Sequence, residues 1–249
     1  MEEGPFLRIL AIESSAGPAS CAVTDGDRVL ASAYAHTGLT HSQTLVPMVN
    51  DMLKNAGLTL REMDLLAVAA GPGSFTGVRI GVAAVKGLAF GLDKPCVGVS
   101  TLAAMARSAQ GLPFDGLVCA AMDARCRQVY AAVFESREGA LSRRTPDEAL
   151  TLDELEERLK TFRKSVFLVG DGAELCYNTF GSRVPGITLA PEFCRYQTAR
   201  GVAAEASERA ADAVTADRLQ PVYLRLPQAE RELRQRQEQR RSEGDPLKN

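Results

Sequence analysis

Hydrophobic and polar positions along the first seventy residues predict a mixed α/β unit. Three short apolar segments come first, at 7–14, 19–25 and 28–36, and the Asp-Gly pair between the last two is typical of a hairpin. Residues 40–56 carry apolar side chains at helical spacing, and the continuous apolar segment 65–70 is typical of a strand covered on both faces. We therefore expect an antiparallel meander, a helix and a buried strand.

The helix predicted over residues 40–56 has clear boundary signals and one residue that conflicts with them. Thr40 and Gln43 have the spacing of a capping box, and Gly57 follows the last apolar position. Pro47 lies inside the pattern and removes one backbone hydrogen bond, which costs about 3 kcal/mol in a regular helix interior. We therefore expect a kink at Pro47 or a later start of the helix.

A loop rich in glycine follows the buried strand and leads into the next helix. The loop occupies residues 71–79, the helix is predicted over 77–91, and a further apolar strand and helix are predicted at 96–100 and 101–109. Three strands, a helix, a strand, a helix and a strand predict a mixed sheet rather than a dinucleotide-binding unit.

The second half of the chain repeats this plan. A pair of strands is predicted at 117–124 and 127–135, and a further strand at 165–172. Between them lies a helix over 151–162 that begins with a capping box formed by Thr151 and Glu154. The two halves therefore predict two similar α/β lobes, each a mixed sheet flanked by helices.

We predict three segments from this repetition. The first lobe comprises residues 1–110, and the second, smaller lobe comprises residues 111–227, including an alanine-rich helix near 198–213 and an extended segment at 221–227. Residues 228–249 are highly charged and have few apolar positions, which is typical of a frayed helix or a disordered tail.

Charge and hydropathy narrow the class of protein. The 249 residues include 29 basic and 31 acidic side chains, so no overall charge points to a nucleic acid or a membrane. The first residues are acidic where a signal peptide needs basic ones, and Lys86, Gly87 and Gly91 interrupt the longest apolar stretch. We expect a cytoplasmic protein with no membrane partner.

The cysteine pattern gives no sign of a disulfide framework or a metal site. Six cysteines occur at positions 21, 96, 119, 126, 176 and 194, without any C-x-x-C spacing. Each lies among apolar or strand-forming neighbours, so reduced structural thiols are the favoured interpretation.

The glycine loop has the setting of a phosphate site without the full motif. Gly71 and Gly73 would let backbone amides turn toward an anion, Ser74 and Thr76 would add hydroxyl groups, and Arg79 would add a cation in the first helical turn. A Walker loop needs a Gly-Lys-Ser/Thr end, and a dinucleotide fingerprint needs glycine where Thr76 stands. Only generic anion binding stays open.

The helix after the loop suggests a different role for its small residues. Gly77, Gly81 and Gly87, together with Ala84, give the helix a thin surface, although each glycine costs about 1 kcal/mol relative to alanine. Such a surface allows another backbone to approach closely. That backbone is either a neighbouring strand of the same lobe or a helix of a partner subunit.

Few residues in the chain are suited to catalysis. Glu13 ends the first strand, and Asp123 occupies the equivalent point of the second lobe. Each is consistent with an acid of a phosphate site. Glu13 is equally consistent with a solvated hairpin, and Asp123 with a carboxylate that caps a turn. The two histidines, His36 and His41, have no spacing typical of metal ligands. No serine or cysteine occurs in a pattern typical of a nucleophile, so we predict no metal site and no catalytic residue.

Several segments together resemble one family. They are LAIESS, CAVTDGDRVLASA, HSQTLVPMVNDML, DLLAVAAGPGSFTGVRIGVAAVKGLAFGLDKPCVGVSTL, MDARCRQVYAAVF and PVYLRLPQAE. In this order they resemble the bacterial tRNA threonylcarbamoyladenosine biosynthesis proteins of the TsaB family, also called YeaZ. The resemblance covers about residues 7–230, and the block around the glycine loop is its most specific part.

The resemblance implies a fold and a role. It implies two actin-like, or ribonuclease H-like, lobes of the kind found in sugar kinases and heat-shock ATPases. It further implies a non-catalytic partner of TsaD, the subunit that transfers a threonylcarbamoyl group to the adenosine beside the anticodon of tRNAs that read codons starting with A. The small ATPase TsaE, tRNA, ATP and magnesium belong to the complex, with no cofactor held tightly by this chain, and self-association is expected when the chain is alone.

The resemblance also implies where a partner binds. The surface comprises the helices of residues 42–55 and 77–91, to which Leu45, Val49, Met52, Leu53, Gly77, Gly81 and Ala84 would contribute. The same residues are equally suited to the core of the lobe. The chain lacks the H-x-x-x-H of TsaD, and Glu13 stands where the superfamily usually has aspartate. The alternative function is an ATP-dependent phosphotransferase or ATPase that uses Glu13 and the glycine loop; a metallopeptidase is disfavoured because the zinc motif is missing.

Overall fold

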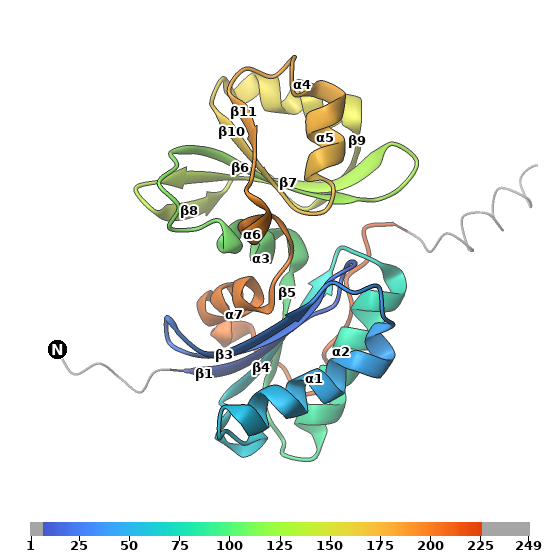
Figure 1. The fold of residues 1–249 in the computed structure, drawn as a ribbon, viewed down its shortest axis with the longest axis vertical. Coiled ribbons are helices and arrows are strands. Elements are labelled where there is room, and N and C mark those ends of the chain that lie inside the picture. The colour runs from blue at the N-terminus through green and yellow to red at the C-terminus, as the bar shows by residue number, and fades with distance from the viewer. Residues whose placement is uncertain (1–6, 226–249) are drawn as a thin grey trace, which may run out of the picture.

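The fold is known from a computed structural model that describes residues 7–225. Figure 1 shows two lobes stacked along the long axis, with helices between them and on their outer faces. The charged segment 228–249 and the last two residues of the predicted segment 221–227 lie outside the described residues.

The first lobe contains a five-stranded sheet. Its strands are β1 (Arg8–Glu13), β2 (Ala19–Asp25), β3 (Arg28–Ala35), β4 (Leu65–Gly71) and β5 (Cys96–Ser100). They lie in the order β3-β2-β1-β4-β5, and only β2 runs antiparallel to the others. The predicted meander and the two buried strands are confirmed.

The second lobe repeats this order. Its strands are β6 (Gly116–Asp123), β7 (Gln128–Arg137), β8 (Ala140–Arg143), β9 (Glu148–Thr151), β10 (Val166–Val169) and β11 (Ile187–Leu189). The strands lie in the order β11-β10-β6-β7-β8, which repeats the first sheet with β6 in the place of β1. Only β7 is antiparallel along this order, and β9 also pairs with β7. Two mixed sheets of this ribonuclease H-like order confirm the predicted fold class, whereas β8, β9 and β11 were not predicted.

Seven α-helices occur in the described residues. They are α1 (His41–Asn55), α2 (Phe75–Phe90), α3 (Thr101–Ser108), α4 (Leu152–Phe162), α5 (Ala173–Phe180), α6 (Glu192–Arg195) and α7 (Ala199–Glu208), with short 3₁₀ turns at Leu60–Glu62 and Ala210–Asp212. The predicted α4 capping box of Thr151 and Glu154 is confirmed.

The start of α1 differs from its prediction. The helix begins at His41 and continues through Pro47, so of the two expected alternatives, a kink or a later start, the later start is wrong. Thr40 is the N-cap residue, but its side chain makes no capping hydrogen bond, so the predicted capping box is wrong as well. The first turn is closed by a bond from the Gln43 amide to the Thr40 carbonyl oxygen at 3.0 Å. Because Pro47 lies in the second turn, it removes only one amide donor from the helix.

Each sheet is covered on both faces, and one helix serves both lobes. In Figure 1, α1 and α2 lie against one face of the first sheet and α7 lies against the other. α4 and α5 cover the outer face of the second sheet. α3 lies between the sheets, with Ala104 packed in the core beneath α7, and Leu102 and Met105 packed against the second sheet. Residues 101–106 are all buried as a result.

After the second lobe the chain returns to the first. Ala199, Val202, Ala203 and Ala206 of α7 pack on the face of the first sheet that α1 and α2 leave open. The Ala199 amide donates to Ser20 Oγ on β2 at 2.8 Å. The structure thus places α7 on the first sheet, although the sequence analysis groups residues 111–227 in the second lobe. The helical pattern is local and carries no information on which sheet the helix covers.

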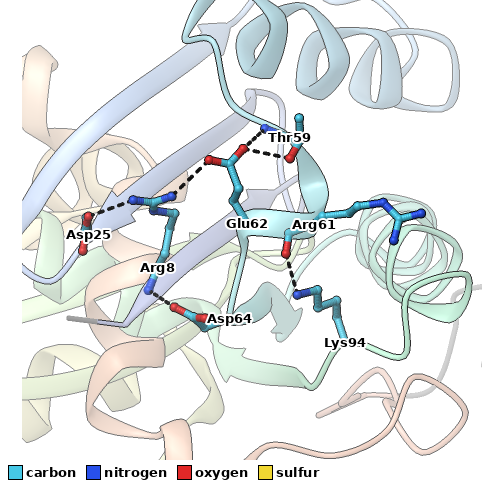
Figure 2. Close-up of polar contacts among 7 residues, drawn as sticks. All are labelled: Arg8, Asp25, Thr59, Arg61, Glu62, Asp64 and Lys94. Atoms are coloured by element: carbon cyan, nitrogen blue, oxygen red, sulfur yellow. Dashed lines mark hydrogen bonds and ion pairs between the residues drawn. The ribbon is translucent and has the colours of Figure 1, made fainter. Parts of the chain in front are cut away.

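A polar network closes one end of the first lobe (Figure 2). The Arg8 guanidinium lies between Asp25 and Glu62, at 3.3 and 3.4 Å, and the Arg8 amide donates to Asp64 Oδ2 at 2.8 Å. Glu62 also accepts from the amide and hydroxyl groups of Thr59. These bonds join the start of β1 to the end of β2 and to the turn that precedes β4.

Five of the six cysteines are buried, as expected for structural thiols. Cys126 is exposed, in the tight turn between β6 and β7. Burial raises the pKa of Cys21 to about 12 and that of Cys96 to about 11, which keeps both thiols protonated at neutral pH. The predicted surroundings are therefore wrong for Cys126 alone.

Within residues 7–225 no helix is both long and apolar enough to cross a membrane. Over the same residues, no three His, Cys, Asp or Glu side chains gather in a way that could hold a metal ion.

Candidate functional site

A cavity of about 480 Å³ lies between the two lobes, where the ends of equivalent strands meet. Its lining includes the turn after β1, the glycine loop, the end of β6, Asp171 and the last described segment, 222–225. Both predicted acids, Glu13 and Asp123, belong to this region, because β1 and β6 are equivalent strands of the two sheets. The repeated topology therefore produces one cleft from two distant parts of the sequence.

The glycine loop uses much of its hydrogen-bonding capacity within the chain. The Ser74 amide donates to the Ser15 carbonyl oxygen at 2.7 Å, and the Gly77 amide donates to Ser74 Oγ at 3.3 Å. A Cβ atom on Gly73 would lie only 2.6 Å from the Ser15 carbonyl oxygen. The glycine at 73 thus allows close packing of the loop on the turn after β1.

The last described segment covers the other side of the loop. The Val222 amide donates to the Ala70 carbonyl oxygen at 2.7 Å, and a Cβ on Gly71, whose φ is +126°, would lie 2.1 Å from the Val222 carbonyl oxygen. Arg79 lies over the Phe75 ring with its Cζ 3.9 Å from the centroid, and Arg79 Nε donates to the Tyr223 hydroxyl at 2.7 Å. The predicted cation of the loop is therefore engaged by the chain itself.

Glu13 is fully buried beneath the cleft and does not line the cavity. One carboxylate oxygen accepts from the Ser15 amide at 2.5 Å, and the other, Oε2, has no hydrogen-bond partner within the described residues. Burial, together with a smaller effect of the nearby charge of Asp171, raises the pKa of Glu13 to about 7. A carboxyl group that is half protonated near neutral pH and closed to solvent is poorly suited to holding magnesium.

The residues of the predicted anion site differ in how far they are open to the cavity. Ser74 and Thr76 are exposed and Gly73 is half-buried at the cavity wall, but Gly71 is buried, Arg79 is engaged and Glu13 is closed off. The structure thus divides the predicted anion set between covered and exposed positions.

Asp123 has a local structural role at the end of β6. One of its carboxylate oxygens accepts a hydrogen bond from the Arg125 amide at 2.7 Å. This bond stabilises the turn into β7, as the turn-capping alternative in the sequence predicts.

The apolar residues assigned to a partner surface on the first helix belong to the core instead. Leu45, Val49, Met52 and Leu53 are all buried and pack with the β-strands of their own lobe. The assignment of these four residues to a partner surface is therefore wrong. An amphipathic helix packs its apolar face on the sheet of its own lobe.

The small residues of α2 have the same explanation. A Cβ on Gly77 would lie 2.2 Å from the Ser14 carbonyl oxygen, and one on Gly81 would lie 2.5 Å from Ser14 Oγ and 3.1 Å from Val68 Cγ2. Ala84 is half-buried and packs against the same core. The chain that approaches α2 closely is therefore Ser14, directly after β1 of the same lobe, together with Val68 of β4, which corrects the assignment of these three residues to an exposed interface.

A different face of α2 is exposed, and the sequence analysis did not select it. Thr76, Ala83, Gly87 and Phe90 lie on one side of the helix, and Phe90 is 81% exposed. A Cβ on Gly87 would meet no atom within 4 Å. Val46 on the neighbouring helix α1 is also exposed. The signal in the sequence was the spacing of 76, 83, 87 and 90, whose steps of seven, four and three residues keep all four on one side of a helix, away from Gly77 and Gly81.

Comparison with known proteins identifies the family. The family model for TsaD, tRNA N6-adenosine threonylcarbamoyltransferase, matches residues 35–246. TsaB of Bacillus subtilis, a tRNA threonylcarbamoyladenosine biosynthesis protein, is 36% identical over 169 residues, which are 68% of this chain and 73% of that protein. The chain belongs to the TsaB family. TsaB of Escherichia coli agrees, with 38% identity over 67% of this chain and 72% of that protein.

Solved structures and a transferase relative sharpen this placement within the TsaB family. YeaZ from Pseudomonas aeruginosa is 30% identical, with a TM-score of 0.71 over 88% of this chain and all of that chain. The transferase of Jannaschia sp. is 42% identical, but over only 35% of this chain and 25% of that protein. The chain thus matches TsaB and YeaZ proteins over most of their length and this transferase over a quarter of its length.

Proposed function

We propose that the chain is the TsaB-type, non-catalytic subunit of the machinery that makes threonylcarbamoyladenosine in tRNA. The observation that supports this role most directly is that the chain's own residues engage part of the glycine loop. Val222 covers Gly71, and Glu13 lies out of contact with the cleft, in a chain whose relatives are named for this biosynthesis. A pair of lobes in which Glu13 is buried and Gly71 is covered is suited to supporting a related catalytic subunit.

The proposed partner is a TsaD-type transferase. We place the contact on the exposed side of α1 and α2, defined by Val46, Thr76, Ala83, Gly87 and Phe90, and call it the α1/α2 surface. The two helices lie side by side on the outer face of the first sheet (Figure 1). Small residues at 83 and 87 let a partner helix approach closely, and Phe90 adds a large apolar area.

The remaining components are proposed at the level of the complex. TsaE and tRNA join through the assembly, and ATP and magnesium are used by the assembly rather than held tightly by this chain. When the transferase is absent, the α1/α2 surface is available for self-association with a second copy. The same apolar area serves both contacts, so the transferase is expected to displace the second copy.

Co-elution of the purified chain with its cognate TsaD-type transferase tests the proposal. We expect a complex at micromolar concentrations. Gly87→Arg should abolish the complex, because a charged side chain would be buried at the contact, while circular dichroism stays native because position 87 is open. Asn178→Arg, at an exposed position of α5 in the other lobe, is the matched control and should keep the complex.

Two results would contradict the proposal. The first is the absence of any complex between two folded proteins. The second is binding of ATP with magnesium to the isolated chain, followed by turnover that Glu13→Ala removes, since this would favour the alternative of an ATPase or phosphotransferase. Calorimetry with ATP and magnesium measures the second directly.

A further inference from the structure

A second cavity, of about 790 Å³, lies on another side of the junction between the lobes. One wall is formed by β3, the edge strand of the first sheet, and the other by α6 and the start of α7. A cavity of this volume lies within the range of small-molecule sites. It shares no lining residue with the interlobe cleft described above.

Aromatic side chains line this cavity from both walls. Tyr34 projects from β3 and is 47% exposed, and Phe193 projects from α6 and is 74% exposed. Tyr196 is half-buried behind them, with its ring 5.5 Å from the ring of His36 and inclined by 62°. Large aromatic surfaces on both sides of a cavity are well suited to a flat ligand. Stacking of the ligand on the rings would remove their exposed apolar surface from water.

The charges around the aromatic walls are arranged asymmetrically. Arg200 is exposed in the first turn of α7 and has no ion-pair or hydrogen-bond partner in the part of the chain described. The start of α7 carries the positive end of the helix dipole, so this end of the cavity favours an anion. Glu192 and Ser32 line the cavity as well, and their oxygens can accept hydrogen bonds from an amino group.

We propose that this cavity, the β3/α6 pocket, binds a nucleobase with its attached phosphate. The base stacks on Tyr34 and Phe193, and the phosphate pairs with Arg200. Aromatic faces beside an unpaired arginine are the combination that recognises unstacked bases, and a stack of this kind tolerates every base because each has a π face. The ligand is either a free nucleotide or a splayed nucleotide of single-stranded RNA. This site goes beyond the proposed function and does not depend on the α1/α2 surface.

Two probes separate the two sources. Adenosine 5′-monophosphate, followed by calorimetry, reports on a free nucleotide, and a fluorescein-labelled five-nucleotide RNA, followed by anisotropy at low salt, reports on a single strand. Ribose 5-phosphate, which lacks the base, is the control ligand for both. We expect at least one probe to bind and ribose 5-phosphate to bind at least tenfold more weakly.

Variants place the binding in the pocket. Phe193→Ala and Tyr34→Ala should each lower the affinity for the probe that binds at least fivefold. Arg200→Ala should lower the affinity for the nucleotide but leave the affinity for adenosine unchanged. Tyr177→Ala, at an aromatic residue of α5 that is 42% exposed, is the matched control and should have no effect. Co-elution of Phe193→Ala with the transferase should be normal, which separates this site from the proposed function.

The proposal is overturned if neither probe binds, if ribose 5-phosphate binds as tightly as the nucleotide, or if the pocket variants bind like Tyr177→Ala. The proposal would also be overturned if a protein bound to the pocket and neither probe displaced it. If the pocket variants lose RNA binding while their affinity for adenosine 5′-monophosphate does not change, the pocket binds single-stranded RNA rather than a free nucleotide.

Discussion

Glu13 shows how a residue suggestive of catalysis in a sequence acquires a different role from its surroundings. Its place at the end of a strand suggested a phosphate site, but the carboxyl group is fully buried, with one oxygen bound by the Ser15 amide and the other without a partner among residues 7–225. A buried carboxylate is costly when ionised and tolerable when protonated. The consequence of Glu13 is therefore a dependence of stability on pH.

Glu13→Gln should reveal this dependence. Because the pKa of Glu13 is raised from 4.5 to about 7 in the folded chain, its favourable contribution is complete below pH 4.5 and is lost as the pH rises through 7. Glutamine stays neutral, so the variant should gain up to about 3 kcal/mol in unfolding free energy over the wild type between pH 5 and pH 8.5. Urea denaturation at both pH values measures this; a difference that does not change with pH would contradict it.

At the scale of the element, α2 combines two kinds of small residue that one sequence pattern cannot separate. Gly77 and Gly81 face Ser14, directly after β1, and Gly81 also faces Val68 of β4, whereas Gly87 faces open space. All three are glycines at near-helical spacing, so the sequence correctly predicted a helix and a close approach. It could not say which glycine met the neighbouring strand, because that depends on how the helix is rotated against the sheet.

Alanine substitutions should separate the two kinds of glycine. Gly81→Ala should lower the unfolding free energy by about 1–3 kcal/mol, because its Cβ would press on Ser14 Oγ and Val68. Gly87→Ala, the matched control, should raise it by about 1 kcal/mol, since the helix gains propensity without a clash. Thermal and urea denaturation measure both. Equal effects at the two positions would show that α2 is rotated differently. By the same reasoning, Gly81→Leu is expected to unfold the lobe rather than leave a folded monomer.

At the scale of the whole molecule, α3 and α7 join the lobes into one unit. α3 contributes Ala104 to the core under α7 and Leu102 and Met105 to the core of the second lobe. A Cβ on Gly201 of α7 would lie 2.1 Å from the Ala104 carbonyl oxygen, so the two helices touch backbone to backbone. Damage at this contact reaches both lobes.

We therefore expect the chain to unfold in one cooperative transition, with equal calorimetric and van't Hoff enthalpies. Gly201→Ala should lower the midpoint of that single transition by several degrees, because α3 and α7 must separate. Gly91→Ala, at an open position after α2, is the control and should leave the midpoint close to that of the wild type. Two resolved transitions, with only one shifted by Gly201→Ala, would show independent lobes.

Local sequence patterns were enough to predict the strands and helices of the first lobe, the repetition of its plan in the second lobe and the family resemblance, but not β8, β9, β11, α5 or α6. The predicted elements follow from hydrophobic period, caps and turns, which are local: the three strands of the meander, the α4 capping box and the apolar face of α1 were all predicted from neighbouring residues. The resemblance rested on segments in order along the chain, and it needed no contacts.

Only the tertiary structure decided which surfaces are closed. Val222 covers Gly71, and α7 packs on the first sheet, so both contacts join residues that are far apart in the chain. The burial of Glu13 depends on such long-range packing. The exposed side of α2 and the β3/α6 pocket likewise come from the rotation of a helix and the meeting of two lobes. A periodic pattern gives the face of an element, but what covers that face is fixed by long-range packing.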